Sequence, residues 1–203
     1  MTERGVTGLL LAGGAGRRMG RPKALVEIDG EPLVRRALRV LADGGCAPLV
    51  VVLGAAADDV RAVLPAGVRA VEAPDWESGM GASLRAGLSA LGGAGPDAGS
   101  DAALVHLVDL PGVTAEAVAR LVAGDVGPAA LRRAAYAGRL AHPVLLGRDH
   151  WPAVAGSATG DAGARAYLRD NPDVEPVECG DVAVPDDVDT PEALARFTAQ
   201  SSR

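Results

Sequence analysis

The sequence has 203 residues, a length that fits one α/β domain with a single buried core. Apolar residues make up 48% of it and aromatic residues only 2%, which argues against a row of stacking platforms for single-stranded nucleic acid. The 20 basic and 26 acidic side chains leave a net charge of −6. A general attraction to phosphate backbones is therefore excluded, and any anion site must be local.

The two cysteines and the amino terminus indicate where the protein works. Cys46 and Cys179 have no CxxC spacing and are too few for a disulfide framework, so reduced thiols are expected. The first apolar run is soon interrupted by glycines, which fits neither a signal peptide nor a membrane span. We therefore predict a cytoplasmic protein with one domain over residues 1–203, and with no membrane or nucleic-acid partner. The low-complexity stretch Gly92–Ser100 is interpreted as an exposed loop.

Strands and helices are predicted to alternate over the first 125 residues. The expected strands are Val6–Ala12, Leu49–Leu53, Val68–Val71 and Ala102–Val108. The expected helices are one opened by Glu31-Pro32 and closed by Gly44-Gly45, then Asp58–Leu64 and Ser83–Leu91. This alternation predicts a mainly parallel sheet with helices on both faces, a three-layer α/β/α fold.

The rest of the chain is less regular. Pro128–Ala135 and Pro143–Leu146 flank an Ala137-Gly138 turn and predict a hairpin, a small antiparallel part of the sheet. Helices are expected near Asp161–Arg169 and over Pro191–Ala199.

A glycine-rich, basic loop follows the first predicted strand. Leu11 to Lys23 contains Gly13, Gly14, Gly16 and Gly20, and has four cations within seven residues. Glycine amides can point inward around an anion while arginine and lysine neutralise it, so phosphate is the expected guest. A surface loop with solvated arginines is the alternative interpretation.

Two common glycine-rich motifs do not fit this loop. A Walker loop needs lysine directly after its last glycine, whereas Gly20 is followed by Arg21-Pro22. A dinucleotide fingerprint starting at Gly14 would need glycine where Met19 stands. The second strand also ends at Gly54 without the acid that binds a ribose.

Two aspartates are candidate metal ligands. Asp109 follows a buried strand, so its carboxylate is expected at the carboxyl edge of the sheet, near Gly13 in space. Taken alone, Asp109 could equally form a turn or a helix cap. Asp189 or Thr190, just before Pro191, could simply cap a helix. Together the two acids suit Mg²⁺, which prefers a few carboxylates plus phosphate oxygens and water.

A second loop, Pro74–Leu84, is expected to approach the ligand. Gly79 and Gly81 allow close backbone contact, and Ser83 could cap the next helix and offer its hydroxyl to a base or ribose. Met80 alone would be assigned to core packing. His106 lies in an apolar strand and is interpreted as a core residue, whereas His150 is placed at the start of a helix.

Taken together, these motifs resemble the molybdenum-cofactor nucleotidyltransferases, and the cytidylyltransferase type more than the guanylyltransferase type. The motifs that carry the resemblance run in family order along nearly the whole chain: Leu11-Ala12-Gly13-Gly14, Arg18-Met19-Gly20, Pro22-Lys23, Asp75-Trp76 to Met80, Ser83-Leu84, Asp109-Leu110-Pro111, His142-Pro143, Gly160 to Arg165, and Asp187 to Pro191. Two departures are Ala141, where the family often has glycine, and Gly14, which makes the first loop partly guanylyl-like.

The resemblance implies a Rossmann-like nucleotidyltransferase fold and a role for each matching residue. It assigns the nucleotide to Leu11, Ala12, Gly13, Gly14, Lys23, Gly79, Met80 and Ser83, with Lys23 on the triphosphate. It assigns Mg²⁺ to Asp109 and Asp189. For the mechanism we expect Lys23, Arg17, Arg18 and Asp109 to be catalytic, because they would neutralise charge on the phosphates. It assigns the acceptor to His142, Asp161 and Arg165.

The implied activity is Mg²⁺-dependent transfer of a nucleotidyl group from CTP, or next GTP, to a phosphate acceptor such as molybdopterin, with release of pyrophosphate. The resemblance also implies contact with a molybdoenzyme or chaperone. Three alternatives stay open: a sugar-phosphate or other small-phosphate nucleotidyltransferase, a non-catalytic nucleotide-binding module, and a dinucleotide-binding oxidoreductase.

Overall fold

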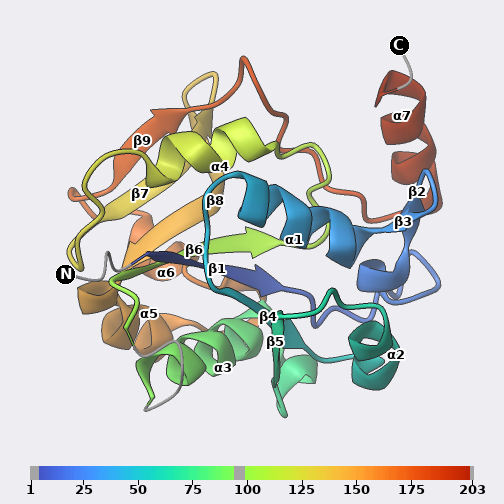
Figure 1. Ribbon diagram of the computed structural model, residues 1–203, viewed down its shortest axis with the longest axis horizontal. Coiled ribbons are helices and arrows are strands. Elements are labelled where there is room, and N and C mark those ends of the chain that lie inside the picture. The colour runs from blue at the N-terminus through green and yellow to red at the C-terminus, as the bar shows by residue number, and fades with distance from the viewer. Residues whose placement is uncertain (1–4, 94–98, 202–203) are drawn as a thin grey trace.

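A seven-stranded, mostly parallel sheet forms the centre of the computed structural model, which describes residues 5–93 and 99–201 (Figure 1). In order across the sheet the strands are β5 (Arg69–Glu72), β4 (Leu49–Leu53), β1 (Val6–Leu11), β6 (Ala102–Leu107), β8 (Arg139–Gly147), β7 (Leu131–Tyr136) and β9 (Glu175–Glu178). Strand β8 pairs antiparallel with both of its neighbours, and the other pairings in this sheet are parallel. A separate antiparallel pair joins β2 (Glu27–Ile28) and β3 (Glu31–Pro32).

Helices cover both faces of the sheet, so the predicted three-layer α/β/α fold is confirmed (Figure 1). On one face lie α1 (Leu33–Asp43) and α4 (Ala115–Val122). On the other lie α3 (Met80–Gly92), α5 (Trp151–Ser157) and α6 (Arg165–Leu168). The remaining helices are α2 (Ala57–Ala62) and α7 (Pro191–Ser201), whose Leu194 and Phe197 pack against the core. The short 3-10 turns are η1 (Lys23–Leu25), η2 (Trp76–Ser78), η3 (Arg148–His150) and η4 (Gly160–Ala162). No helix within the described ranges is long and apolar enough to cross a membrane.

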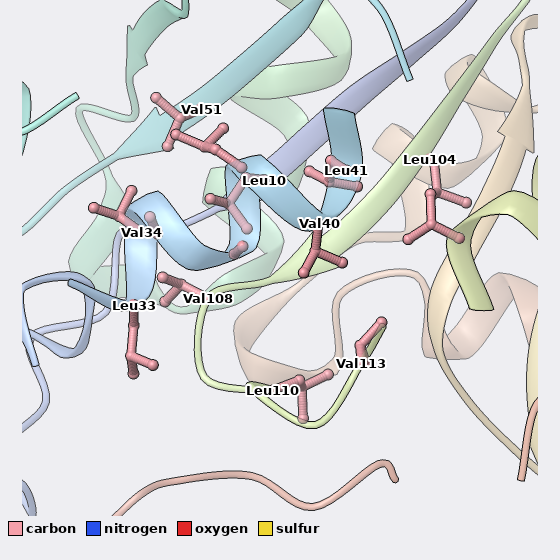
Figure 2. Close-up of a cluster of buried hydrophobic side chains, with 14 of the residues drawn as sticks. Leu10, Leu33, Val34, Val40, Leu41, Val51, Leu104, Val108, Leu110 and Val113 are labelled. Atoms are coloured by element: carbon pink, nitrogen blue, oxygen red, sulfur yellow. The ribbon is translucent and has the colours of Figure 1, made fainter. Parts of the chain in front are cut away.

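The packing of the core explains the apolar patterns of β1 and α1. All six residues of β1 are buried, because a parallel strand covered on both faces has no solvent side. Figure 2 shows Val34 of α1 beside Leu10 of β1 and Val51 of β4, and Leu33 and Leu41 of α1 belong to the same buried cluster. The helical period seen in the sequence is therefore the buried stripe of α1.

The chain reverses its direction of travel across the sheet between β1 and β6. From β1 it moves to β4 and β5 on one side, and then returns to β6 on the other side, where Leu11 pairs with Leu107. Ligands of open α/β sheets bind outside the carboxyl ends of the strands at such a switch point. Residues that follow Leu11 and Leu107 therefore lie where a fold of this kind binds its ligand.

Most predicted elements are confirmed to within a few residues, with one correction. Ser83 does not cap α3, because the helix already begins at Met80 with Gly79 as its N-cap. The β7–β8 hairpin turns at Ala137-Gly138 as expected, with both φ angles positive. The sequence interpretation missed β9 and the β2–β3 pair, and the predicted Gly92–Ser100 loop lies partly outside the described residues.

His106 is a buried core residue, as predicted, and this gives the fold an acid sensitivity. Its side chain is 1% exposed, and burial, with a smaller effect of nearby His142, lowers its pKa to about 3. The unfolded chain takes up a proton near pH 6.5 but the folded chain does not, so stability is lost as the pH falls from about 6.5 toward 3. Between pH 7 and pH 5 we expect this residue alone to cost about 2 kcal/mol.

Urea unfolding at the two pH values measures the effect. The variant His106→Leu has no titrating group at this position, so it is expected to lose about 2 kcal/mol less than the wild type over the same interval. Equal losses in the two proteins would contradict the assignment of the acid sensitivity to His106.

Candidate active site

Two glycines of the loop after β1, Gly13 and Gly16, leave no room for a side chain. Gly16 has φ of +61°, and a Cβ built there would overlap the carbonyl oxygen of Arg21. Gly13 packs against the next loops, since an added Cβ would lie 2.9 Å from Ser83 Oγ and 3.5 Å from the nitrogen of Gly54. The loop therefore folds back on itself and delivers Lys23 to the end of β1.

Gly16→Ala is expected to destabilise the protein by about 2 kcal/mol or more, because the new methyl group is both sterically blocked and in a left-handed conformation. Thermal and urea unfolding measure this cost. Gly14→Ala is the matched control, because a Cβ at Gly14 meets nothing within 4 Å and its φ is not in the left-handed region. If both variants lose the same stability, Gly16 does not hold the loop in shape.

Lys23 lies between the two candidate aspartates. Its Nζ donates to Asp109 Oδ2 at 2.6 Å and also to Asp189 Oδ1, while Arg18 donates to Asp189 Oδ2. The side chains of Lys23, Asp109 and Asp189, called the triad below, are only 16–19% exposed. The side chain of Arg18 is 72% exposed. The predicted neighbourhood of the basic loop and the two distant aspartates is confirmed. Lys23 is also the only lysine in the sequence, which has 20 basic residues in all.

Burial and charge compete within this triad. Burial works to lower the pKa of Lys23, but the Asp109 and Asp189 carboxylates outweigh it and leave the pKa above its ordinary value. Burial works to raise the pKa of Asp189, and the hydrogen bond and charge of Lys23 more than offset it, so this pKa is lowered. Near neutral pH Lys23 is therefore an ammonium paired with the Asp189 carboxylate.

The backbone fixes Asp189 beside Asp109. Val188 donates its N–H to the carbonyl oxygen of Asp109 at 2.8 Å, which ties the segment before α7 to the end of β6. Thr190 Oγ1 accepts from the N–H of Ala193 at 3.2 Å. Thr190 therefore caps the following helix, and the carboxylate of Asp189 is directed to Lys23 instead.

The carboxylates of Asp109 and Asp189 are suited to bind a divalent cation whose other ligands are phosphate oxygens and water. Both reach the same cation in this structure, the Lys23 ammonium, so their oxygens converge on one point. No cluster of three or more acidic, His or Cys side chains suited to a metal occurs among residues 5–93 and 99–201. A site with two protein carboxylates is the arrangement Mg²⁺ uses when phosphate oxygens and water complete its shell.

The second predicted loop packs against the first and against the segment before α6. A Cβ at Gly54 would lie 2.7 Å from Trp76, and one at Gly79 would lie 2.7 Å from Asp161 Oδ1. A Cβ built at Gly163 would lie 3.1 Å from the terminal methyl carbon of Met80, so the Met80 side chain packs against Gly163. Gly79 and Asp161 are therefore neighbours, although different roles were predicted for them.

The predicted acceptor residues divide between two places. His142 and Arg165 line one cavity of about 230 Å³, next to Leu11 and Met80, whereas Asp161 lies behind Gly79 and outside the cavity lining. Sequence reasoning missed Arg133, which also lines this cavity from β7. Arg17, predicted to be catalytic, is exposed on the first loop.

The glycine-rich, basic loop faces two aspartates at the switch point of the sheet. This arrangement defines a class of α/β protein that binds a phosphorylated ligand at the carboxyl ends of its strands. The model of the MobA-like NTP transferase domain matches residues 8–176. The chain belongs to this family and is a nucleotidyltransferase by class, as the sequence motifs predicted.

Individual relatives cover almost the whole chain. The nicotine blue oxidoreductase of Paenarthrobacter nicotinovorans is 42% identical over 95% of this chain and 96% of its own. The molybdenum cofactor guanylyltransferase of Rhodobacter capsulatus is 33% identical over 94% of each chain. Among solved structures, the manganese complex of Rv0371c from Mycobacterium tuberculosis H37Rv is 27% identical, with a TM-score of 0.75 over 96% of this chain and 98% of that one.

Proposed function

We propose that this chain, acting as one domain over residues 1–203, transfers the nucleotidyl group of a nucleoside triphosphate to a phosphate-bearing acceptor and releases pyrophosphate. The observation that carries the proposal is the Lys23 ammonium held between Asp109 and Asp189 beside the glycine loop. A cation and a metal-competent pair of carboxylates at one point suit a triphosphate better than they suit any neutral ligand.

The proposed chemistry needs no protein nucleophile. An oxygen of the acceptor phosphate attacks the α-phosphorus, the bond from the α-phosphorus to the bridging oxygen breaks, and pyrophosphate carries away the electron pair. In this proposal Lys23 and Arg18 compensate the negative charge on the phosphates, and Arg17, exposed on the same loop, joins them when a ligand binds. A divalent cation, Mg²⁺ in our proposal, would be held by Asp109 and Asp189 and would supply further charge neutralisation.

The nucleotide half of the site involves Leu11, Ala12, Gly13 and Gly14 of the first loop and Gly79, Met80 and Ser83 of the second. The motifs of the sequence favour CTP, whereas the molybdenum cofactor relatives carry the name guanylyltransferase. We therefore propose GTP and CTP as the two donors to compare, and molybdopterin as the acceptor. A molybdoenzyme or chaperone that receives the product, in the cytoplasm, would complete this proposal.

A thermal-shift panel followed by a pyrophosphate-release assay tests the function. GTP, CTP, ATP and UTP are each added with Mg²⁺ or Mn²⁺, and a ligand at 100 times its Kd should stabilise the fold by about 2.7 kcal/mol. The nucleotide that stabilises most is then assayed with molybdopterin. Absence of stabilisation by all four nucleotides would refute the proposal. Binding of a nucleotide without release of pyrophosphate would indicate that the protein is a non-catalytic, nucleotide-sensing module.

A second candidate activity is the reduction of a small aromatic substrate by a reduced dinucleotide. It is favoured by the 42% identity to a protein named nicotine blue oxidoreductase. Against it stand Met19, at the position of the third fingerprint glycine, and Gly54, at the position of the ribose-binding acid. Oxidation of NADH or NADPH in the presence of nicotine blue, followed by absorbance, distinguishes this activity from nucleotidyl transfer.

A further inference from the structure

A cavity of about 230 Å³ opens beside the end of β1, next to the proposed nucleotide site. Its walls are mostly apolar and come from both halves of the chain: Leu11, Leu84, Val105, Val144, Leu146 and Leu168. Its charged or polar lining consists of Arg133, His142 and Arg165. The cavity therefore combines an apolar body with positive charge, and none of the acidic side chains in residues 5–93 and 99–201 lines it.

Arg133 is held in this cavity without a counter-ion. Its Nη2 donates to the carbonyl oxygen of Leu140 at 3.3 Å, and its Nε is buried with no partner. Neither Arg133 nor Arg165 forms an ion pair with an acidic side chain in the part of the chain that the structure describes. Burial, and then the charge of Arg165, lower the pKa of Arg133. A half-buried cation next to a like charge is unfavourable unless an anion is bound there.

The neighbouring arginine on the same strand shows what a structural arginine looks like. Arg132 donates from Nε to Glu175 at 3.0 Å and from Nη1 to the carbonyl oxygens of Leu121 and Ala123 at 3.0 and 2.8 Å. Its donors are used within the fold, whereas those of Arg133 are largely unused. Consecutive residues of a strand point to opposite faces, so only Arg133 of this pair faces the cavity.

His142 adds a second unsatisfied group. It hydrogen bonds to the backbone of Val105, but its Nδ1 is buried with no partner. The Asp109 carboxylate acts electrostatically on His142, as do both cavity arginines. His142 thus lines the positive cavity and is also within electrostatic reach of Asp109.

We propose that this cavity is the acceptor subsite, and that Arg133, with Arg165 at its rim, selects an acceptor that has a phosphate monoester on an apolar ring system. The inference rests on the proposed function, and it adds Arg133 as a residue that determines acceptor specificity. The ring would lie against the leucine and valine walls, and the guanidinium groups would bind the phosphate oxygens in the forked geometry that suits arginine.

Binding of 1-naphthyl phosphate, measured by isothermal titration calorimetry, tests the subsite with a stable probe. The wild type should bind it, and uncharged 1-naphthol should bind at least about tenfold more weakly, because charge-assisted hydrogen bonds are lost. Arg133→Gln should weaken binding of the phosphate by about tenfold or more, while Arg133→Lys should keep part of it. Arg139→Gln, at the exposed turn of the same hairpin, is the control for overall charge.

Two further readouts separate a binding role from a structural one. Arg133→Gln removes an unpaired buried cation, so its melting temperature should be unchanged or raised, whereas loss of a structural arginine would lower it. Binding of the preferred nucleotide should be unchanged in this variant. If the wild type binds naphthyl phosphate but no nucleotide, the proposed function fails, and the cavity remains a site for an aromatic phosphate that Arg133 recognises. Failure of the wild type to bind naphthyl phosphate, or equal binding by Arg133→Gln, overturns the inference.

Discussion

Lys23→Ala is expected to lower kcat/KM for pyrophosphate release by about a hundredfold or more, the usual cost of removing one preorganised charge-stabilising group. Asp109 and Asp189 hold the ammonium at the end of β1, so it already lies close to where the phosphates would bind. The raised pKa keeps it protonated near neutral pH, so the midpoint of any loss of activity caused by its deprotonation should lie above pH 10.5. Steady-state kinetics of both variant and wild type measure the effect.

Lys23→Arg is the sharper variant, because it keeps the charge. A guanidinium is planar and larger than an ammonium, so it should not fit between two carboxylates that share one nitrogen, and activity should stay low. Arg61→Ala is the control for loss of a positive charge, since Arg61 pairs only with exposed Asp58 and Glu72. Wild-type kcat/KM in Lys23→Ala would remove Lys23 from the mechanism.

The position of the site could be predicted from sequence because it depends on strands. Two buried apolar runs, each ending in a distinctive residue, predict that Gly13 and Asp109 meet at one edge of a parallel sheet. The role of Asp189 could not be decided in this way, since either Asp189 or Thr190 could cap a helix that starts at Pro191. The structure distinguishes them, because Thr190 forms the cap and Asp189 contacts Lys23, whereas by its local sequence either residue could have formed the cap.

Other features were missed for identifiable reasons. The β2–β3 pair turns at Asp29-Gly30, both with positive φ, and Asp-Gly is a strong hairpin signal that strands of only two residues made easy to overlook. Arg133 was missed because charge runs usually lie in solvent. Alternation along a strand would have indicated that Arg132 and Arg133 face opposite sides, and therefore that one of them points inward.

Asp109→Asn is expected to lower kcat/KM by about a hundredfold or more, mainly because the variant binds the divalent cation more weakly. The amide keeps the shape of the carboxylate but not its charge, so the remaining carboxylate, Asp189, would hold a divalent cation alone. Titration of Mg²⁺ or Mn²⁺ in the presence of nucleotide should give a much higher half-saturating concentration than in the wild type. Asp186→Asn, an exposed acid close by in the chain, should behave as the wild type.

The double variant Lys23→Ala with Asp109→Asn tells whether the triad acts as a unit. Groups that contact each other and stabilise the same charge give strongly non-additive losses, so the double variant should be little worse than either single one. Independent roles would instead multiply the two losses to about ten-thousandfold. Because Lys23 Nζ and Asp109 Oδ2 are 2.6 Å apart, we expect non-additivity, and fully multiplicative losses would separate the lysine from the metal site.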